Sequence, residues 1–128
     1  MITLLSIALF GAIGSLIRFH FGGYVHTSVN SALSSEKQFP FGTLFVNIAG
    51  SFLLGFLTGL SIYHALNPFV LAMLGTGFCG ALTTFSTLAV DLQRFIRDGR
   101  YIHAAMDLML SLFAGAGAAW AGFVITTP

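Results

Sequence analysis

Four stretches of the chain are long and apolar enough to cross a lipid bilayer as helices. A transmembrane helix needs about 20 predominantly apolar residues to cross roughly 30 Å of hydrocarbon. The stretches cover about residues 2–24, 41–63, 68–95 and 101–125. We therefore expect an all-α membrane protein in the inner or plasma membrane, with residues 1–128 forming one transmembrane domain of four spans.

The composition excludes several other classes of protein. Only 7% of the residues are charged and 56% are hydrophobic, whereas an ordinary soluble domain has about 25% charged residues. The net charge of +1 and the scattered basic residues provide no surface for nucleic acid. The single cysteine, Cys79, excludes an internal disulfide and a cysteine metal cluster. The sequence has no phosphate-binding loop and no nucleophile–base pair, so we do not expect an enzyme.

The basic residues predict how the chain is oriented in the membrane. With four spans, the first and third loops lie on the same side. All five Lys and Arg residues lie on or toward that side: Arg18, Lys37, Arg94, Arg97 and Arg100. The positive-inside rule therefore places these loops in the cytoplasm and both termini outside. The first span has no basic segment before it and is too long for a signal-peptide core, so we expect it to be retained.

Polar residues within the spans are informative, because in lipid they need a partner or a water-filled cavity. Two spans carry them at every fourth position, on one helix face: Thr43, Asn47 and Ser51 in the second, and His103, Asp107, Ser111 and Gly115 in the fourth. Each stripe can line a hydrophilic path or join helices through hydrogen bonds. Asn47 is the better path candidate, because its amide offers two donors to an anion. We expect Asp91 to pair with Arg94, one turn later.

The third span is poor material for a continuous helix. It contains three glycines followed by four hydroxyl residues: Gly75, Gly77, Gly80, Thr83, Thr84, Ser86 and Thr87. We expect a broken helix, which at membrane depth is tolerated only inside protein or around a cavity. Its free carbonyls would suit a hard cation, and its free amides and hydroxyls an anion. The alternative is a glycine-rich packing face whose hydroxyls bond back to their own helix.

Two motifs in the second and third spans are specific enough to compare with a known family. They are Gly42–Gly50 (Gly-Thr-Leu-Phe-Val-Asn-Ile-Ala-Gly) and Gly77–Thr87 (Gly-Phe-Cys-Gly-Ala-Leu-Thr-Thr-Phe-Ser-Thr). Together with the Gly-x-x-x-Arg spacing of Gly14–Arg18, they resemble the Fluc/CrcB family of fluoride channels over nearly the whole chain. The resemblance implies a fluoride-selective ion channel that lets fluoride leave the cytoplasm and so lowers its toxicity. It also implies an antiparallel, dual-topology dimer with two pores and a structural sodium ion (Na+) at its centre.

The resemblance implies roles for individual residues. The backbone carbonyls of Gly80 and Thr83 would bind the sodium ion, and Arg18 would lie in a vestibule. The fluoride pathway would be lined by an amide, an aromatic ring and hydroxyls: Thr43, Asn47, Phe85, Ser86, Thr87 and Ser111. Fluoride is small and strongly hydrated, so donors of these kinds must replace its water shell.

Three residues depart from the family pattern. A second pore phenylalanine falls at Leu88, an expected serine falls at Gly115, and Asp107 places a carboxylate on the same stripe. The charge bias is also unusual for a dual-topology homodimer. Two assemblies therefore stay open, a homodimer and a heterodimer with a related subunit of opposite orientation, in which this chain conducts poorly alone. Two other functions stay open as well, a small four-helix coupled transporter that uses Asp107 and a non-conducting scaffold.

Overall fold

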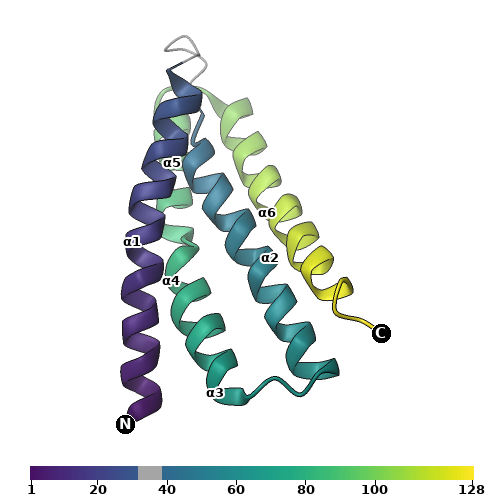
Figure 1. Ribbon diagram of the computed structural model, residues 1–128. Helices are drawn as coiled ribbons and strands as arrows, with labels where there is room; N and C mark the ends of the chain where they lie inside the picture. Colours follow the sequence, from purple (N-terminus) through teal and green to yellow (C-terminus); the bar gives the residue numbers. More distant parts are fainter. Residues whose placement is uncertain (32–38) are drawn as a thin grey trace.

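The computed structural model describes residues 1–31 and 39–128, which form a bundle of helices with no strand among them (Figure 1). The elements are, in chain order, α1 (Ile2–Asn30), α2 (Phe41–Tyr63), α3 (Pro68–Leu71), the π-helical segment η2 (Ala72–Cys79), α4 (Gly80–Leu82), α5 (Phe85–Arg97) and α6 (Tyr101–Val124). Helices α1, α2 and α6 are continuous, whereas α3, η2, α4 and α5 follow one another along the third span.

The four predicted membrane spans are confirmed. The helical stretches long and apolar enough to cross a bilayer are Ile2–Ser28, Phe41–Tyr63, Pro68–Arg97 and Tyr101–Val124. Helix α1 continues beyond the predicted end of the first span and reaches Asn30. A helix pairs its own backbone groups and can therefore continue into a polar sequence. The polar side chain of Thr27 is accommodated in this extension, because its hydroxyl donates to the Gly23 carbonyl of the same helix at 2.9 Å.

The third span is broken, as predicted. Helical structure begins at Pro68, continues through η2 and ends at Leu82. Thr83 and Thr84 are extended, with ψ angles of 154° and 122°, and α5 begins a new helix at Phe85. The alternative, a glycine-rich packing face whose hydroxyls bond back to their own helix, does not describe the whole span, because the helix is interrupted. One hydroxyl does follow it, since Thr83 Oγ1 donates to the Cys79 carbonyl at 3.1 Å. The physical reason for the interruption is that hydroxyl residues offer the backbone hydrogen bonds outside the helix.

Glycines allow two close helix contacts, one between α6 and α2 and the other between η2 and α1. A Cβ atom at Gly122 of α6 would overlap the backbone of Phe52 in α2. A Cβ atom at Gly77 of η2 would lie 2.8 Å from the carbonyl oxygen of Ile7 in α1. Small residues at helix contacts are the usual means of association in lipid, where hydrophobic burial does not draw helices together. These contacts hold α1 against the third span and α6 against α2.

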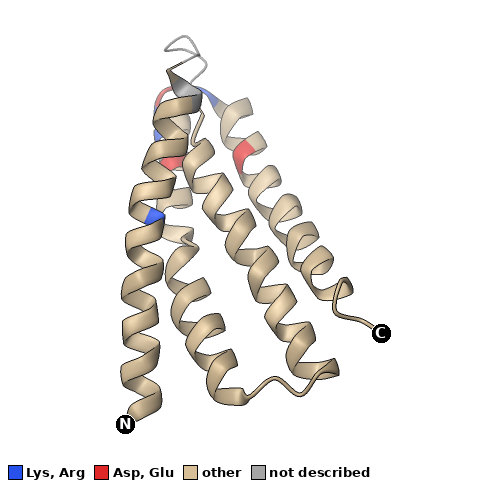
Figure 2. Cartoon of the chain, viewed as in Figure 1, with Lys and Arg blue, Asp and Glu red and all other residues tan. Residues whose placement is uncertain are grey.

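The charged residues lie in one half of the molecule (Figure 2). That half contains the connection between α5 and α6, whereas both termini lie toward the other end (Figure 1). This arrangement agrees with the predicted grouping of the basic residues, of which Lys37 lies outside the described residues. The cytoplasmic location of the charged end stays a prediction from the positive-inside rule.

Candidate functional site

The break in the third span is held by a side chain from α2. The Asn47 Oδ1 atom accepts a hydrogen bond from the Thr84 amide at 2.7 Å, and Asn47 Nδ2 donates to the Thr84 carbonyl at 3.1 Å. One carboxamide thus pairs both backbone polar groups of a residue that has left the helix. Because unpaired backbone groups are costly in lipid, Asn47 supports the break at membrane depth.

The break also takes away the amide groups that would pair with two backbone carbonyls, those of Gly80 and Thr83, in a continuous helix. In a continuous helix the Gly80 carbonyl would accept from the Thr84 amide, but that amide donates to Asn47. The Thr87 amide would pair with the Thr83 carbonyl, but it donates to the Thr84 hydroxyl at 3.2 Å. The carbonyls predicted to bind sodium therefore belong to residues whose helical pairing is lost. Backbone oxygens of this kind are hard ligands and fit a small cation.

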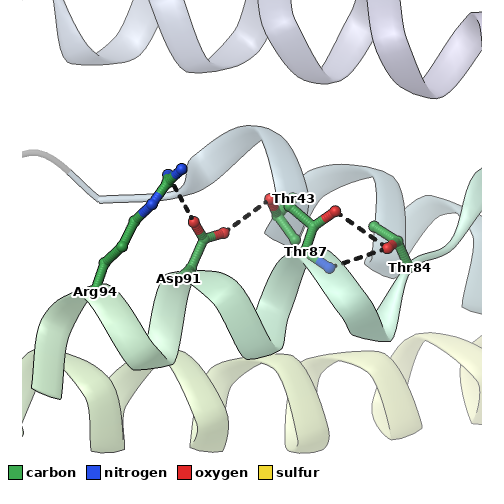
Figure 3. A network of polar contacts seen from close by, with 5 residues as sticks. All are labelled: Thr43, Thr84, Thr87, Asp91 and Arg94. Carbon is green, nitrogen blue, oxygen red and sulfur yellow. Dashed lines mark hydrogen bonds and ion pairs between the residues drawn. The ribbon is translucent and has the colours of Figure 1, made fainter.

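Hydroxyl groups gather at the first turn of α5. The Thr84 Oγ1 atom caps this helix by accepting from the Thr87 amide, and it lies 3.1 Å from each of the Ser86 and Thr87 hydroxyl oxygens. Figure 3 shows Thr84 and Thr87 pointing toward each other. The N-terminus of a helix carries free amides and a positive partial charge, so it favours an anion. Thr84 was not among the predicted pathway residues, although a threonine just before a helix is a known capping signal.

A second polar group lies further along α5 (Figure 3). The Thr43 hydroxyl of α2 donates to Asp91 Oδ2 at 3.2 Å, and Arg94 Nη1 lies 3.6 Å from Asp91 Oδ1. The predicted pairing of Asp91 with Arg94 is confirmed. Thr43 and Asn47 of α2 both hydrogen-bond to the third span. The polar stripe of α2 therefore joins helices through hydrogen bonds, which was one of the two predicted roles for it.

Hollows lie on both sides of the break. One, of about 440 Å³ between α1, α2 and α5, is lined by three of the predicted residues: Arg18, Thr43 and Thr87. The other, of about 340 Å³ between α2, the break and α6, is lined by four: Asn47, Thr83, Phe85 and Ser111. Thr84 lines both hollows. The predicted residues thus fall into two groups that meet at the break, whereas Gly80 and Ser86 line neither hollow.

Phe85 and Leu88 differ sharply in exposure although they lie one turn apart. Phe85 is 77% exposed and Leu88 only 6%. Most of Phe85 is therefore open to lipid or to a second subunit, although the residue also lines the 340 Å³ hollow. Leu88 contributes to the wall of the 340 Å³ hollow and brings no polarised ring edge to it.

The polar stripe of α6 faces the inside of the bundle. Asp107 is 1% exposed, and Asp107 Oδ2 and Ser111 Oγ are buried without a hydrogen-bond partner among the described residues. A Cβ atom at Gly115 would lie 3.6 Å from the Ser51 hydroxyl oxygen, so the stripes of α2 and α6 face each other. Asp107 is buried more deeply than its position near the end of a span indicated.

Polar backbone at membrane depth is typical of channels and transporters, in which it lines a cavity. Four spans and a supported break therefore define a multi-pass protein of the cell membrane of this general class. Comparison with protein families narrows the class. The family model described as "CrcB-like protein, Camphor Resistance (CrcB)" matches residues 5–123, and the chain belongs to this family.

Curated relatives match along most of the chain. "Fluoride-specific ion channel FluC" of Geobacter metallireducens is 38% identical over 125 residues, which cover 97% of this chain and 96% of the relative. "Fluoride-specific ion channel FluC 2" of Rhodococcus jostii is 40% identical over 125 residues, with 98% and 99% covered. "Fluoride-specific ion channel FluC" of Gloeobacter violaceus is 40% identical over 114 residues, with 89% and 87% covered. The resemblance seen in the sequence is confirmed, and the family is one of channels rather than enzymes.

Proposed function

We propose that this chain forms a fluoride-selective channel through which fluoride leaves the cytoplasm, so that its toxicity is lowered. The observation that carries the proposal is the group of donors at the break, where the hydroxyls of Thr84, Ser86 and Thr87 meet at the start of α5. A small, strongly hydrated anion needs such donors to replace its water shell. The names of the relatives support fluoride as that anion.

The two hollows correspond to two parts of the proposed pathway. In the 440 Å³ hollow, the Arg18 side chain attracts the anion into a vestibule, and the hydroxyls of Thr43 and Thr87 lie on its wall. The 340 Å³ hollow is lined by Asn47, Phe85 and Ser111. Their amide, ring edge and hydroxyl are groups that carry positive partial charge. Passage from one hollow to the other leads past Thr84, which lines both.

A second subunit completes the site in this proposal. Phe85 and Gly80 are exposed beside the break, and polar backbone that meets lipid is not tolerated. A dimer would cover this surface. The carbonyls of Gly80 and Thr83, which have lost their helical donors, support a structural sodium ion shared by two subunits, because one chain supplies few oxygen ligands.

A heterodimer with a related subunit of opposite orientation is a second candidate for this assembly. It is favoured by the position of all five Lys and Arg residues toward one side. Leu88 and Asp107 also favour it, because in this alternative they would weaken conduction by the chain alone. Co-expression with each candidate partner, with tags on both chains, tests this assembly. Recovery of a fully active homodimer whose tags are accessible on both membrane faces would contradict the heterodimer.

Fluoride efflux from liposomes, measured with a fluoride electrode, tests the proposed function. We expect fast, electrogenic loss of fluoride while chloride is retained, because a channel moves the ion alone and selects it by its hydration. Fluoride loss no faster than from protein-free liposomes, both for this chain alone and for its co-expressed complexes with candidate partners, would refute the proposal. Proton-coupled efflux of an organic cation would instead support the coupled transporter that the sequence left open.

A further inference from the structure

Two acidic side chains are buried in the described part of the chain, Asp91 and Asp107, and they differ in their partners. Asp91 accepts from Thr43 and lies beside Arg94. Asp107 Oδ2 has no hydrogen-bond partner within residues 1–31 and 39–128, and neither does the Ser111 hydroxyl one turn later. A charged carboxylate with an unpaired oxygen is expensive inside a membrane bundle.

The helices packed against α6 do not supply a compensating charge. Helix α2 contains no Asp, Glu, Lys, Arg or His. Helix α5 contributes Asp91, whose negative charge repels a second one on Asp107, and Arg94, which already lies beside Asp91. Its remaining charged residue, Arg97, is exposed in the last turn of the helix. A metal ion is no better match, because within the described ranges no group of three or more His, Cys, Asp or Glu side chains is placed to hold one.

Two basic groups near this end of α6, on His103 and Arg100, lie against an aromatic ring. His103, one turn before Asp107, has its ring centroid 5.8 Å from that of Phe95. The Arg100 guanidinium, just before the start of α6, lies 4.8 Å from the centre of the same ring. A proton is therefore the simplest species that removes the charge of Asp107.

We infer that Asp107 is a proton-binding site beside the anion pathway, and that the channel conducts when this side chain is the neutral acid. Asp107 lies one helical turn before Ser111, which lines the 340 Å³ hollow. Loss of the proton places a negative charge behind that wall and opposes the passing anion. This inference rests on the proposed function and adds regulation to the same pathway.

The first test measures fluoride efflux from liposomes over a series of pH values. We expect efflux by the parent protein to fall by about tenfold or more as the solution becomes alkaline, since a unit charge at close range acts strongly on an anion. The Asp107→Asn variant should conduct at every pH as fast as it does in acidic solution. Asp98→Asn, which changes an exposed carboxylate between α5 and α6, should follow the parent. Protein-free liposomes at each pH correct for the leak of hydrogen fluoride. Identical pH profiles for the parent and Asp107→Asn would overturn the inference.

Infrared spectroscopy in the same lipid tests the proton without any transport. We expect the carbonyl band of a protonated carboxylic acid in the parent at the pH values where efflux is fast, and its loss in Asp107→Asn. A parent protein without this band would overturn the inference even if it conducts fluoride. A band without fluoride transport would refute the proposed function and leave the proton site standing. If Asp107→Asn fails to assemble, titration of the band in the parent decides, because it must disappear over the pH range in which efflux falls.

Discussion

The side-chain amide of Asn47 makes two hydrogen bonds with the backbone of Thr84, at 2.7 Å and 3.1 Å, and so joins α2 to the break in the third span. Because one carboxamide serves as acceptor and donor, both polar groups of the Thr84 backbone are paired at membrane depth. In the proposed channel, Asn47 therefore supports the pathway as well as lining it.

Replacing Asn47 with aspartate keeps the acceptor for the Thr84 amide but turns the donor into an oxygen that faces the Thr84 carbonyl. We expect the free energy of unfolding to fall by about 1–3 kcal/mol, the cost of an unpaired buried polar group, and fluoride efflux to slow strongly. Thermal unfolding in detergent and the liposome assay measure the two effects. Thr58→Val is the control on the same helix, because the Thr58 hydroxyl donates to the Leu54 carbonyl of its own helix. Equal behaviour of both variants would mean that Asn47 does not hold the break.

Phe85→Ile should reduce fluoride efflux while leaving the fold of the chain intact. The Phe85 ring is 77% exposed in this chain, so its removal costs little internal packing, but isoleucine has no polarised ring edge for an anion. Liposome efflux and thermal unfolding are compared with those of Phe113→Ile. Phe113 is 69% exposed on α6 and lines neither hollow. If the two variants conduct equally, Phe85 has no specific role in the pathway.

Gly122→Ala should destabilise the contact between α2 and α6. The added methyl group would overlap the backbone of Phe52, and overpacking of this kind costs about 1–3 kcal/mol. Gly117→Ala is the matched control on the same helix, because no atom lies within 4 Å of its added Cβ. There alanine should be neutral or stabilising, since it is a better helix former than glycine. Thermal unfolding distinguishes the two variants, and equal melting temperatures would contradict the close approach of these helices.

Sodium should stabilise the assembled protein if the carbonyls of Gly80 and Thr83 bind it. An ion that binds only the folded state stabilises it by about 2.7 kcal/mol at a concentration a hundredfold above its dissociation constant. We therefore expect the unfolding temperature to rise with sodium concentration, and not with N-methylglucamine at equal ionic strength. Unfolding curves that coincide in the two salts would argue against a bound sodium ion at the break.

Local sequence was sufficient for the features that depend on neighbouring residues. The four spans follow from the length of apolar stretches, because lipid-exposed backbone must pair its polar groups internally, as a helix does. The break follows from the hydroxyl residues after Gly80, which favour bonds outside the helix. The pairing of Asp91 with Arg94 follows from a separation of one helical turn, which puts both on the same helix face.

The sequence by itself therefore determined a four-span membrane protein with a broken third span, and its motifs determined the family. Only the tertiary structure decided that Asn47 binds Thr84 and that Thr43 binds Asp91. It also decided that Asp107 is buried and that its Oδ2 atom has no hydrogen-bond partner among the described residues. Helical periodicity places a residue on a face but does not say which residue of another helix that face will meet. Contacts between helices depend on the distance between them. Here that distance is determined by glycine contacts such as that of Gly122 with Phe52.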